Sequence, residues 1–198
     1  MTFDSDIDID LADRNQLLEH IKHIPAAMHK VNPIRKHATG IYVTDVPYDS
    51  INDMSSLDYS DAEKRGYVKL DFLNVHVYEK VRDEMHLIEL MREPKWGKLY
   101  DRKFVENLIH LSNHYNSIQR MPEPIDTIPR LAMFLAIIRP AKKHLIGLPW
   151  KKVSETVWEK ESGDYHFKKS HSVAYANLVV VHMNLLSHPL YKSNTLTF

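Results

Sequence analysis

The sequence predicts an α+β or α/β protein, with a sheet formed within residues 1–75 and a mainly helical portion over residues 76–198. Three short runs rich in β-branched and aromatic residues precede residue 75, which is typical of strands. After Asn74 the apolar residues recur at helical spacing. A chain of 198 residues with 43% hydrophobic content is long enough to bury a core. We therefore expect two regions that differ in secondary structure.

Three strands and one helix are expected in the first region. Acidic and apolar residues alternate over residues 6–11, as in a strand, and Asp13 is placed to cap a helix. The apolar positions of that helix are Leu17, Leu18, Ile21 and Ile24. The runs GIYVTDV (40–46) and GYVKLDFL (66–73) lie between turn-forming residues and predict two further strands.

Helices are expected throughout the second region. One apolar stripe fits a single face of a helix and consists of Phe104, Leu108, Leu111, Tyr115 and Ile118. Three prolines, Pro122, Pro124 and Pro129, separate this stripe from the next predicted helix, RLAMFLAII (130–138). A last helix, from Ser172 to about Ser187, is apolar around most of its circumference, so we expect it to be buried.

The amino-acid composition excludes several classes of protein. The absence of cysteine excludes disulfides and thiolate metal sites, and a cytoplasmic location is expected. The first residues are acidic, and the longest apolar run, around 173–186, contains Asn177, His182 and Asn184, so neither a signal peptide nor a membrane interaction is expected. Because 26 basic residues balance 26 acidic ones, binding of nucleic acid would require a local basic groove.

The segment SDIDIDLADR (5–14) contains the first candidate site. On a strand, Asp6, Asp8 and Asp10 point to the same face, with their Cα atoms about 6.5–7 Å apart. Such carboxylates favour hard divalent cations, and phosphoryl-transfer enzymes hold two of these ions about 3.5–4 Å apart. An acidic alternation on an exposed edge strand, without a metal ion, is the other interpretation.

The segment KLDF (69–72) adds a second set of candidates. Lys69 and Asp71 point to one face of the predicted strand, while Leu70 and Phe72 point to the other. Asp71 could thus add a third carboxylate to the acidic face, and Lys69 could add a positive charge that contacts a phosphate. The alternative is that both side chains simply lie on the solvent side of a sheet.

Five segments resemble motifs of the family C bacterial replicative DNA polymerases, the alpha subunit of DNA polymerase III. SDIDIDLADR resembles their P-D-F-D-I-D-F strand, RKHATGIYVTD their H-A-x-G-V-V-I segment, and GYVKLDFLNV their G-L-x-K-x-D-F-L-G-L strand. LAMFLAIIRPAK is similar to A-L-x-R-P-G-P. YHFKKSHSVAYANLVVVHMNLLSHPLY is similar to F-x-K-S-H-x-x-A-Y-A followed by an apolar helix. The five segments occur in the family's order and span most of the chain.

The resemblance implies a nucleotidyltransferase-type, palm-like sheet at 1–75 and a helical, fingers-like portion at 76–198. It implies that Asp6, Asp8 and Asp71 are catalytic and hold Mg²⁺ or Mn²⁺, with Asp10 as a supporting residue. The substrate-binding residues that it implies are Lys69 and His37 on the palm side and Lys169, Ser170 and His171 on the fingers side.

Three of these assignments have structural alternatives. Gly40 would help His37 to shape the palm, but His37 is also one of 13 histidines in the chain. Ser170 could merely cap the first turn of a helix. Arg139 either contacts substrate or anchors a turn by packing its stem.

The chain also departs from the family pattern. It begins a few residues before the first acidic strand, which leaves no room for the family's G-R-G-S loop that holds the incoming triphosphate. The family's R-P-G-P has become Arg139-Pro140-Ala141-Lys142. We therefore expect robust polymerisation to require a partner or oligomer that supplies the missing phosphate contacts.

Three classes of function remain open. The first is a two-metal nucleotidyltransferase acting on DNA and nucleoside triphosphate in DNA replication. The second is a catalytically lapsed, polymerase-derived module, phage-encoded given its small size, that binds DNA, nucleotide or a replication protein. The third is a homo-oligomeric structural protein with the valine-rich last helix at its interface. The retained carboxylates favour the first class, and the missing loop favours the second.

Overall fold

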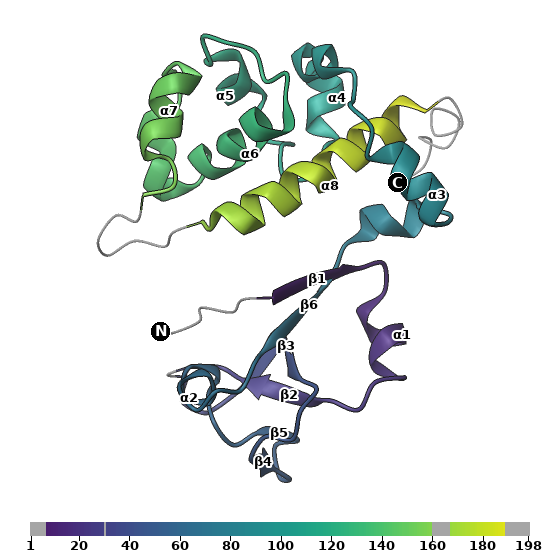
Figure 1. Cartoon of the computed structure of the whole chain (residues 1–198), viewed down its shortest axis with the longest axis vertical. Coiled ribbons are helices and arrows are strands. Elements are labelled where there is room, and N and C mark those ends of the chain that lie inside the picture. Colours follow the sequence, from purple (N-terminus) through teal and green to yellow (C-terminus); the bar gives the residue numbers. More distant parts are fainter. Residues whose placement is uncertain (1–6, 30, 160–166, 189–198) are drawn as a thin grey trace. The chain divides into compact units, whose positions relative to one another are not determined.

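A computed structural model describes residues 7–29, 31–159 and 167–188 and shows a mixed α+β protein (Figure 1). The predicted α+β class is therefore confirmed. The chain divides into two compact units, unit 1 (Met1–Lys80) and unit 2 (Val81–Phe198). The boundary lies five residues beyond residue 75, where the sequence analysis placed it.

Unit 1 contains a four-stranded mixed sheet with the strand order β1-β6-β3-β2. Its strands are β1 (Ile7–Leu11), β2 (Ile24–Ala27), β3 (Lys36–Tyr42) and β6 (Leu70–Asn74). β1 pairs with β6 in parallel, whereas β3 is antiparallel to both β6 and β2. β6 therefore lies inside the sheet, between the first predicted strand and the HATG segment.

Shorter elements complete unit 1. They are α1 (Arg14–Leu18), the hairpin of β4 (Tyr48–Asp49) and β5 (Met54–Ser55), α2 (Tyr59–Lys64) and the 3₁₀ helix η1 (His76–Lys80). Asp13 caps α1 as predicted, because its side chain accepts hydrogen bonds from the backbone N–H groups of Asn15 and Gln16. Asp58 caps α2 in the same way through the N–H of Asp61.

The predicted continuation of the first helix to Ile24 is wrong. α1 ends at Leu18, and Ile24 begins strand β2, where it pairs with Tyr42. Pro25 accounts for the conformation of Ile24, since a proline disfavours the helical conformation of the residue before it. Pairing with β3 then determines the conformation of this segment.

The core of unit 1 forms between the sheet and α2. Ala26 and Tyr42 from the sheet pack with Val46 and with Ala62 of α2, and all four are buried. Gly66 adopts a φ of 87° directly after α2 and thereby turns the chain toward β6. α2 and the Gly66 turn therefore place the segment that begins β6.

Unit 2 is helical (Figure 1). Its elements are α3 (Glu84–Leu90), η2 (Trp96–Tyr100), α4 (Arg102–Glu106), α5 (Tyr115–Gln119), α6 (Ile128–Ile137), η3 (Pro140–Leu145), α7 (Trp150–Thr156) and α8 (Lys169–Ser187). α6 and α3 both pack against the long helix α8. Proline at the start of α6 and the hydroxyl of Thr127, which accepts from the N–H of Arg130, define where that helix begins.

The predicted single helix through Phe104 and Ile118 is wrong, because the structure has two short helices there, α4 and α5. His110, between them, has a φ of 61°, which is incompatible with a continuous α-helix. The apolar stripe nevertheless marks the core, since Leu108 and Leu111 are fully buried. Burial of these side chains therefore does not require one helix.

The last helix is buried as predicted. It begins at Lys169, three residues before the expected start, and ends at Ser187. Val179 and Val180 pack in the core of unit 2 together with Phe134 of α6. Within residues 7–29, 31–159 and 167–188, no helix has both the length and the apolar character needed to cross a membrane.

Gly66 provides a test of the turn before β6. Gly66→Ala is expected to lower the free energy of unfolding by about 1–2 kcal/mol, because an L-residue is disfavoured at positive φ. A Cβ at Gly66 would meet no atom within 4 Å, so the loss would come from the backbone alone. Denaturation followed by circular dichroism measures the change. Gly97→Ala is the control, since Gly97 also faces open space but has no positive φ; equal losses in both variants would refute the argument.

Candidate functional site

Two acidic residues lie side by side within the sheet of unit 1. The parallel register of β1 and β6 pairs Asp8 with Asp71, and Gly40 of β3 is the partner of Asp71 on the other side. Paired residues on neighbouring strands are about 4.8 Å apart and point to the same face. The predicted sharing of one face by Asp8 and Asp71 is therefore confirmed. Asp10 follows on the same face of β1, while Asp6 lies outside the described residues.

Asp71 is a buried carboxylate held by two donors. Its side chain is 9% exposed, and it accepts hydrogen bonds from the hydroxyl of Thr39, at 2.7 Å, and from the ammonium of Lys69. Burial alone would raise the pKa of Asp71, but the bonds from Lys69 and Thr39 and the charge of Lys69 outweigh it and lower the pKa. Asp71 is therefore ionised at neutral pH.

Lys69 approaches Asp71 across a gap that Gly40 leaves open. The side chain of Lys69 is 16% exposed, and its ammonium lies 5.8 Å from the centre of the Tyr59 ring. A Cβ on Gly40 would lie only 2.8 Å from Cδ of Lys69. The absence of a side chain at Gly40 therefore allows the lysine stem to reach Asp71. The expectation that Lys69 and Asp71 point to one face is confirmed by their contact.

His37 also belongs to this site. Its Nδ1 accepts a hydrogen bond from the N–H of Gly40 at 2.9 Å and a longer one, 3.3 Å, from the N–H of Thr39. The same nitrogen lies 3.6 Å from the carboxylate of Asp71. The edge of the ring meets Tyr59 at 5.7 Å between centroids. The backbone of β3 therefore fixes His37 beside the carboxylate.

Burial and nearby carboxylates raise the pKa values of two tyrosines in unit 1. Tyr42 is fully buried, and its pKa is raised to about 12 by burial first and then by the charges of Asp58, Glu63 and Asp71. Burial and the charge of Asp10 likewise raise the pKa of Tyr78. Carboxylates thus add to the effect of burial at both tyrosines.

The arrangement fits the donor set of a divalent cation. Asp8 and Asp71 offer carboxylate oxygens from adjacent strands, and Mg²⁺ binds to one or two protein carboxylates with water and phosphate as its other ligands. Within the described part of the chain, no three His, Cys, Asp or Glu side chains are grouped closely enough to hold a metal ion. The predicted third ligand, Asp6, is not among those residues.

The remaining predicted residues belong to unit 2. The guanidinium of Arg139 lies 4.7 Å from the centre of the Phe167 ring, and His171 stacks on the same ring at 6.1 Å. Phe167 therefore brings Arg139 and His171 together. Lys169 is exposed and lies 5.9 Å from the ring centre of Trp158. The suggestion that Ser170 caps the helix is wrong, because Lys168 is the N-cap and no side chain caps that end.

The structure adds residues that sequence reasoning missed. In unit 1 these are Thr39 and Tyr59; Thr39 lies in the HATG segment that had been singled out, but nothing in the sequence pointed to Tyr59. In unit 2, His110 stacks on Tyr175 at 4.3 Å between centroids. The pKa of His110 is lowered by burial and by the charge of Arg139. His110 therefore extends the group of cations and rings around Phe167.

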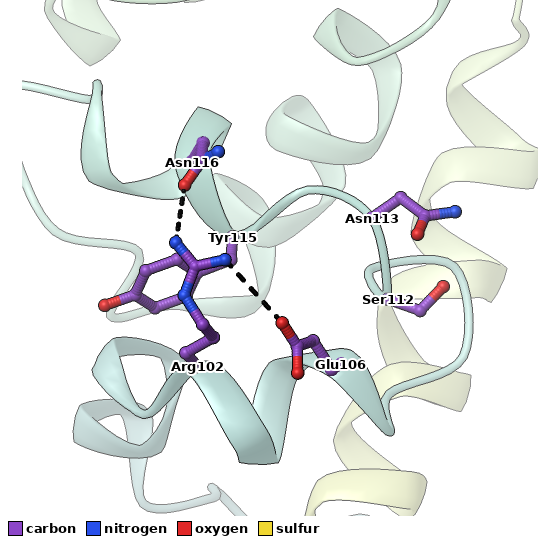
Figure 2. A pocket seen from close by; sticks show the side chains of 6 residues that line it. All are labelled: Arg102, Glu106, Ser112, Asn113, Tyr115 and Asn116. Atoms are coloured by element: carbon purple, nitrogen blue, oxygen red, sulfur yellow. Dashed lines mark hydrogen bonds and ion pairs between the residues drawn. The ribbon is translucent and has the colours of Figure 1, made fainter.

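Unit 2 also contains a polar pocket of about 310 Å³ (Figure 2). It is lined by Arg102, Glu106, Ser112, Asn113, Tyr115 and Asn116. The guanidinium of Arg102 donates to Asn116 at 2.9 Å, lies 3.6 Å from Glu106 and covers the Tyr115 ring at 4.5 Å. None of the catalytic or binding residues predicted from the sequence lines this pocket. Its arginine is already engaged by neighbouring side chains, which indicates a structural role.

Comparison with known proteins gives no family assignment: the sequence matches no family model, no curated protein and no solved structure. The resemblance to the family C polymerases therefore stays a prediction.

The acid dependence of stability tests the environment of Asp71. Because its pKa is lowered in the folded state, its ionised form stabilises the protein above the ordinary aspartate pKa, 3.8, and this contribution is lost as the pH falls through the lowered value. Asp71→Asn should therefore be less stable than the native protein at neutral pH and should lose less stability on acidification. Urea denaturation at a series of pH values measures both effects.

The matched control for this experiment is Asp45→Asn, since the carboxylate of Asp45 is 90% exposed in its pair with Lys22. It should follow the native curve closely, because exposed ion pairs contribute about 0–1 kcal/mol. Native and Asp71→Asn curves of the same shape would show that Asp71 is not stabilised by its neighbours.

Proposed function

We propose that the protein is a Mg²⁺-dependent nucleotidyltransferase of the DNA polymerase type, in which unit 1 is the palm-like catalytic part and unit 2 the fingers-like part. The observation that carries this proposal is the register that sets Asp8 beside Asp71, with Lys69 in contact with Asp71. The five motifs that resemble family C polymerases, in the family's order, support the same assignment.

Each residue of unit 1 has a role in this proposal. Asp8 and Asp71 would hold Mg²⁺ or Mn²⁺, and the resemblance implies Asp6 as a further ligand. Two such ions held there would supply a lowered pKa of the attacking hydroxyl and stabilisation of the leaving pyrophosphate. The hydrogen bond from Thr39 fixes the orientation of the Asp71 carboxylate. Lys69 supplies a positive charge for a substrate phosphate, and the substrates are a DNA primer–template and a nucleoside triphosphate.

Primer extension tests the activity directly. The purified protein alone should extend a labelled primer slowly on a template with Mg²⁺ or Mn²⁺, because the missing phosphate contacts limit the rate. Asp8→Ala should abolish the product, because one of the two adjacent carboxylates is lost. Asp45→Ala, which removes a carboxylate that is 90% exposed, should leave extension unchanged. No extension under any metal condition, or extension that persists in Asp8→Ala, would refute the enzymatic assignment.

A second candidate function is a module that binds DNA or nucleotide without catalysis, alone or with a replication protein. The grouping of Arg139, Phe167 and His171 and the exposed Lys169 favour it. Proteins that bind single-stranded nucleic acid combine aromatic rings that stack on bases with cations that contact phosphates. In this function unit 2, rather than the carboxylates of unit 1, would bind the DNA or nucleotide.

Fluorescence anisotropy with a labelled single-stranded oligonucleotide tests this second function. Lys168→Ala/Lys169→Ala should weaken binding and reduce its dependence on salt, because phosphate contacts release counterions. The matched control is Lys151→Ala/Lys152→Ala, since both lysines of this adjacent pair on α7 are exposed. Equal weakening in both double variants would indicate general charge attraction, and no binding by the native protein would exclude this function.

A further inference from the structure

We propose that Lys69 is an internal counterion of Asp71 that must leave when a divalent cation binds there, and that its departure makes its ammonium available to a substrate phosphate. This inference rests on the proposed function, because it concerns the same carboxylates. It also predicts the order of binding: the metal ion binds before the substrate phosphate.

The first step of the argument is the burial of the pair. The side chains of Asp71 and Lys69 are 9% and 16% exposed, and the ammonium donates to the carboxylate. A buried carboxylate is strongly disfavoured without a positive partner. In the absence of a metal ion, Lys69 supplies that partner, so the fold of the sheet does not depend on metal.

The second step is electrostatic competition. A divalent cation on Asp71 would place two positive charges beside the ammonium of Lys69, and such repulsion is strong where water is largely excluded. The same carboxylate oxygen, Oδ2, that accepts from Lys69 is one of the two oxygens that Asp71 could offer to a metal ion. Occupation of Asp71 by both cations is therefore disfavoured, and one replaces the other.

The third step is the freedom of Lys69 to move. Lys69 precedes β6, and its flexible stem passes over Gly40 beside the ring of His37. The ring of Tyr59, 5.8 Å from the ammonium, offers a second favourable contact for the positive charge. The lysine can therefore turn from Asp71 while it remains near the site.

Replacement of Lys69 by an apolar side chain of similar length gives a direct test. Isothermal titration calorimetry with Mn²⁺ should show binding to Lys69→Met on the order of tenfold tighter than to the native protein, as expected when a competing cation is removed. Gly40→Ala should act in the same direction, because its Cβ would lie 2.8 Å from Cδ of Lys69 and push the stem aside. Lys36→Met is the control and should change the affinity less than about twofold, since Lys36 forms a more exposed pair with Asp53.

A second measurement uses the native protein and is independent of whether the variants fold. Brief acetylation followed by mass spectrometry should modify Lys69 several-fold faster with Mn²⁺ than without it. Lys22, which is 87% exposed, should react equally in both conditions.

The outcomes separate this inference from the proposed function. Tighter binding by Lys69→Met together with faster acetylation of Lys69 establishes the exchange. If Mn²⁺ binds native protein and Lys69→Met equally, or binds without changing the reactivity of Lys69, the exchange is refuted while the metal site stands. If Mn²⁺ binds neither protein, both the metal site and the exchange are refuted.

Discussion

The ion pair between Lys69 and Asp71 is the interaction on which the organisation of unit 1 depends. Asp71 belongs to a strand with a neighbour on each side, a place where apolar residues are the norm. Removal of one partner from a buried ion pair typically costs about 3–5 kcal/mol, because the other charge is left uncompensated. The sheet can therefore contain a carboxylate at this position only because Lys69 and Thr39 reach it.

Several otherwise unrelated features of unit 1 follow from that requirement. Gly40 has no side chain, which leaves room for the lysine stem. The positive φ of Gly66 returns the chain from α2 to β6, and this brings Asp71 into the sheet with Lys69 just before the strand. The cap of α2 at Asp58 places Tyr59 at the start of the helix, where its ring faces the ammonium. Local conformation and electrostatics thus support the same arrangement.

The structural features that depend on short-range periodicity could be predicted from the sequence. The shared face of Lys69 and Asp71 follows from the two-residue repeat of a strand, and the buried last helix follows from its apolar circumference. The sequence did not predict features that depend on distant contacts. Thr39 reaches Asp71 across 32 positions in the sequence. Strand β2 was not predicted, and its first residue, Ile24, was assigned to a helix, because the pairing with β3 could not be seen. His110 interrupts the predicted helix with a positive φ. Nothing in the sequence indicated this, because the residue is not a glycine.

The alternating carboxylates of the first strand gain a physical explanation from the sheet. Asp8 and Asp71 are neighbours on one face, so their charges repel each other, yet their surroundings differ. Asp8 is partly exposed, whereas Asp71 is buried and is neutralised by an ammonium. A carboxylate that is buried with an exchangeable counterion, beside one that water can reach, combines a stable resting state with affinity for a stronger cation. Two equally exposed carboxylates would hold a cation weakly, and two equally buried ones would need two permanent counterions.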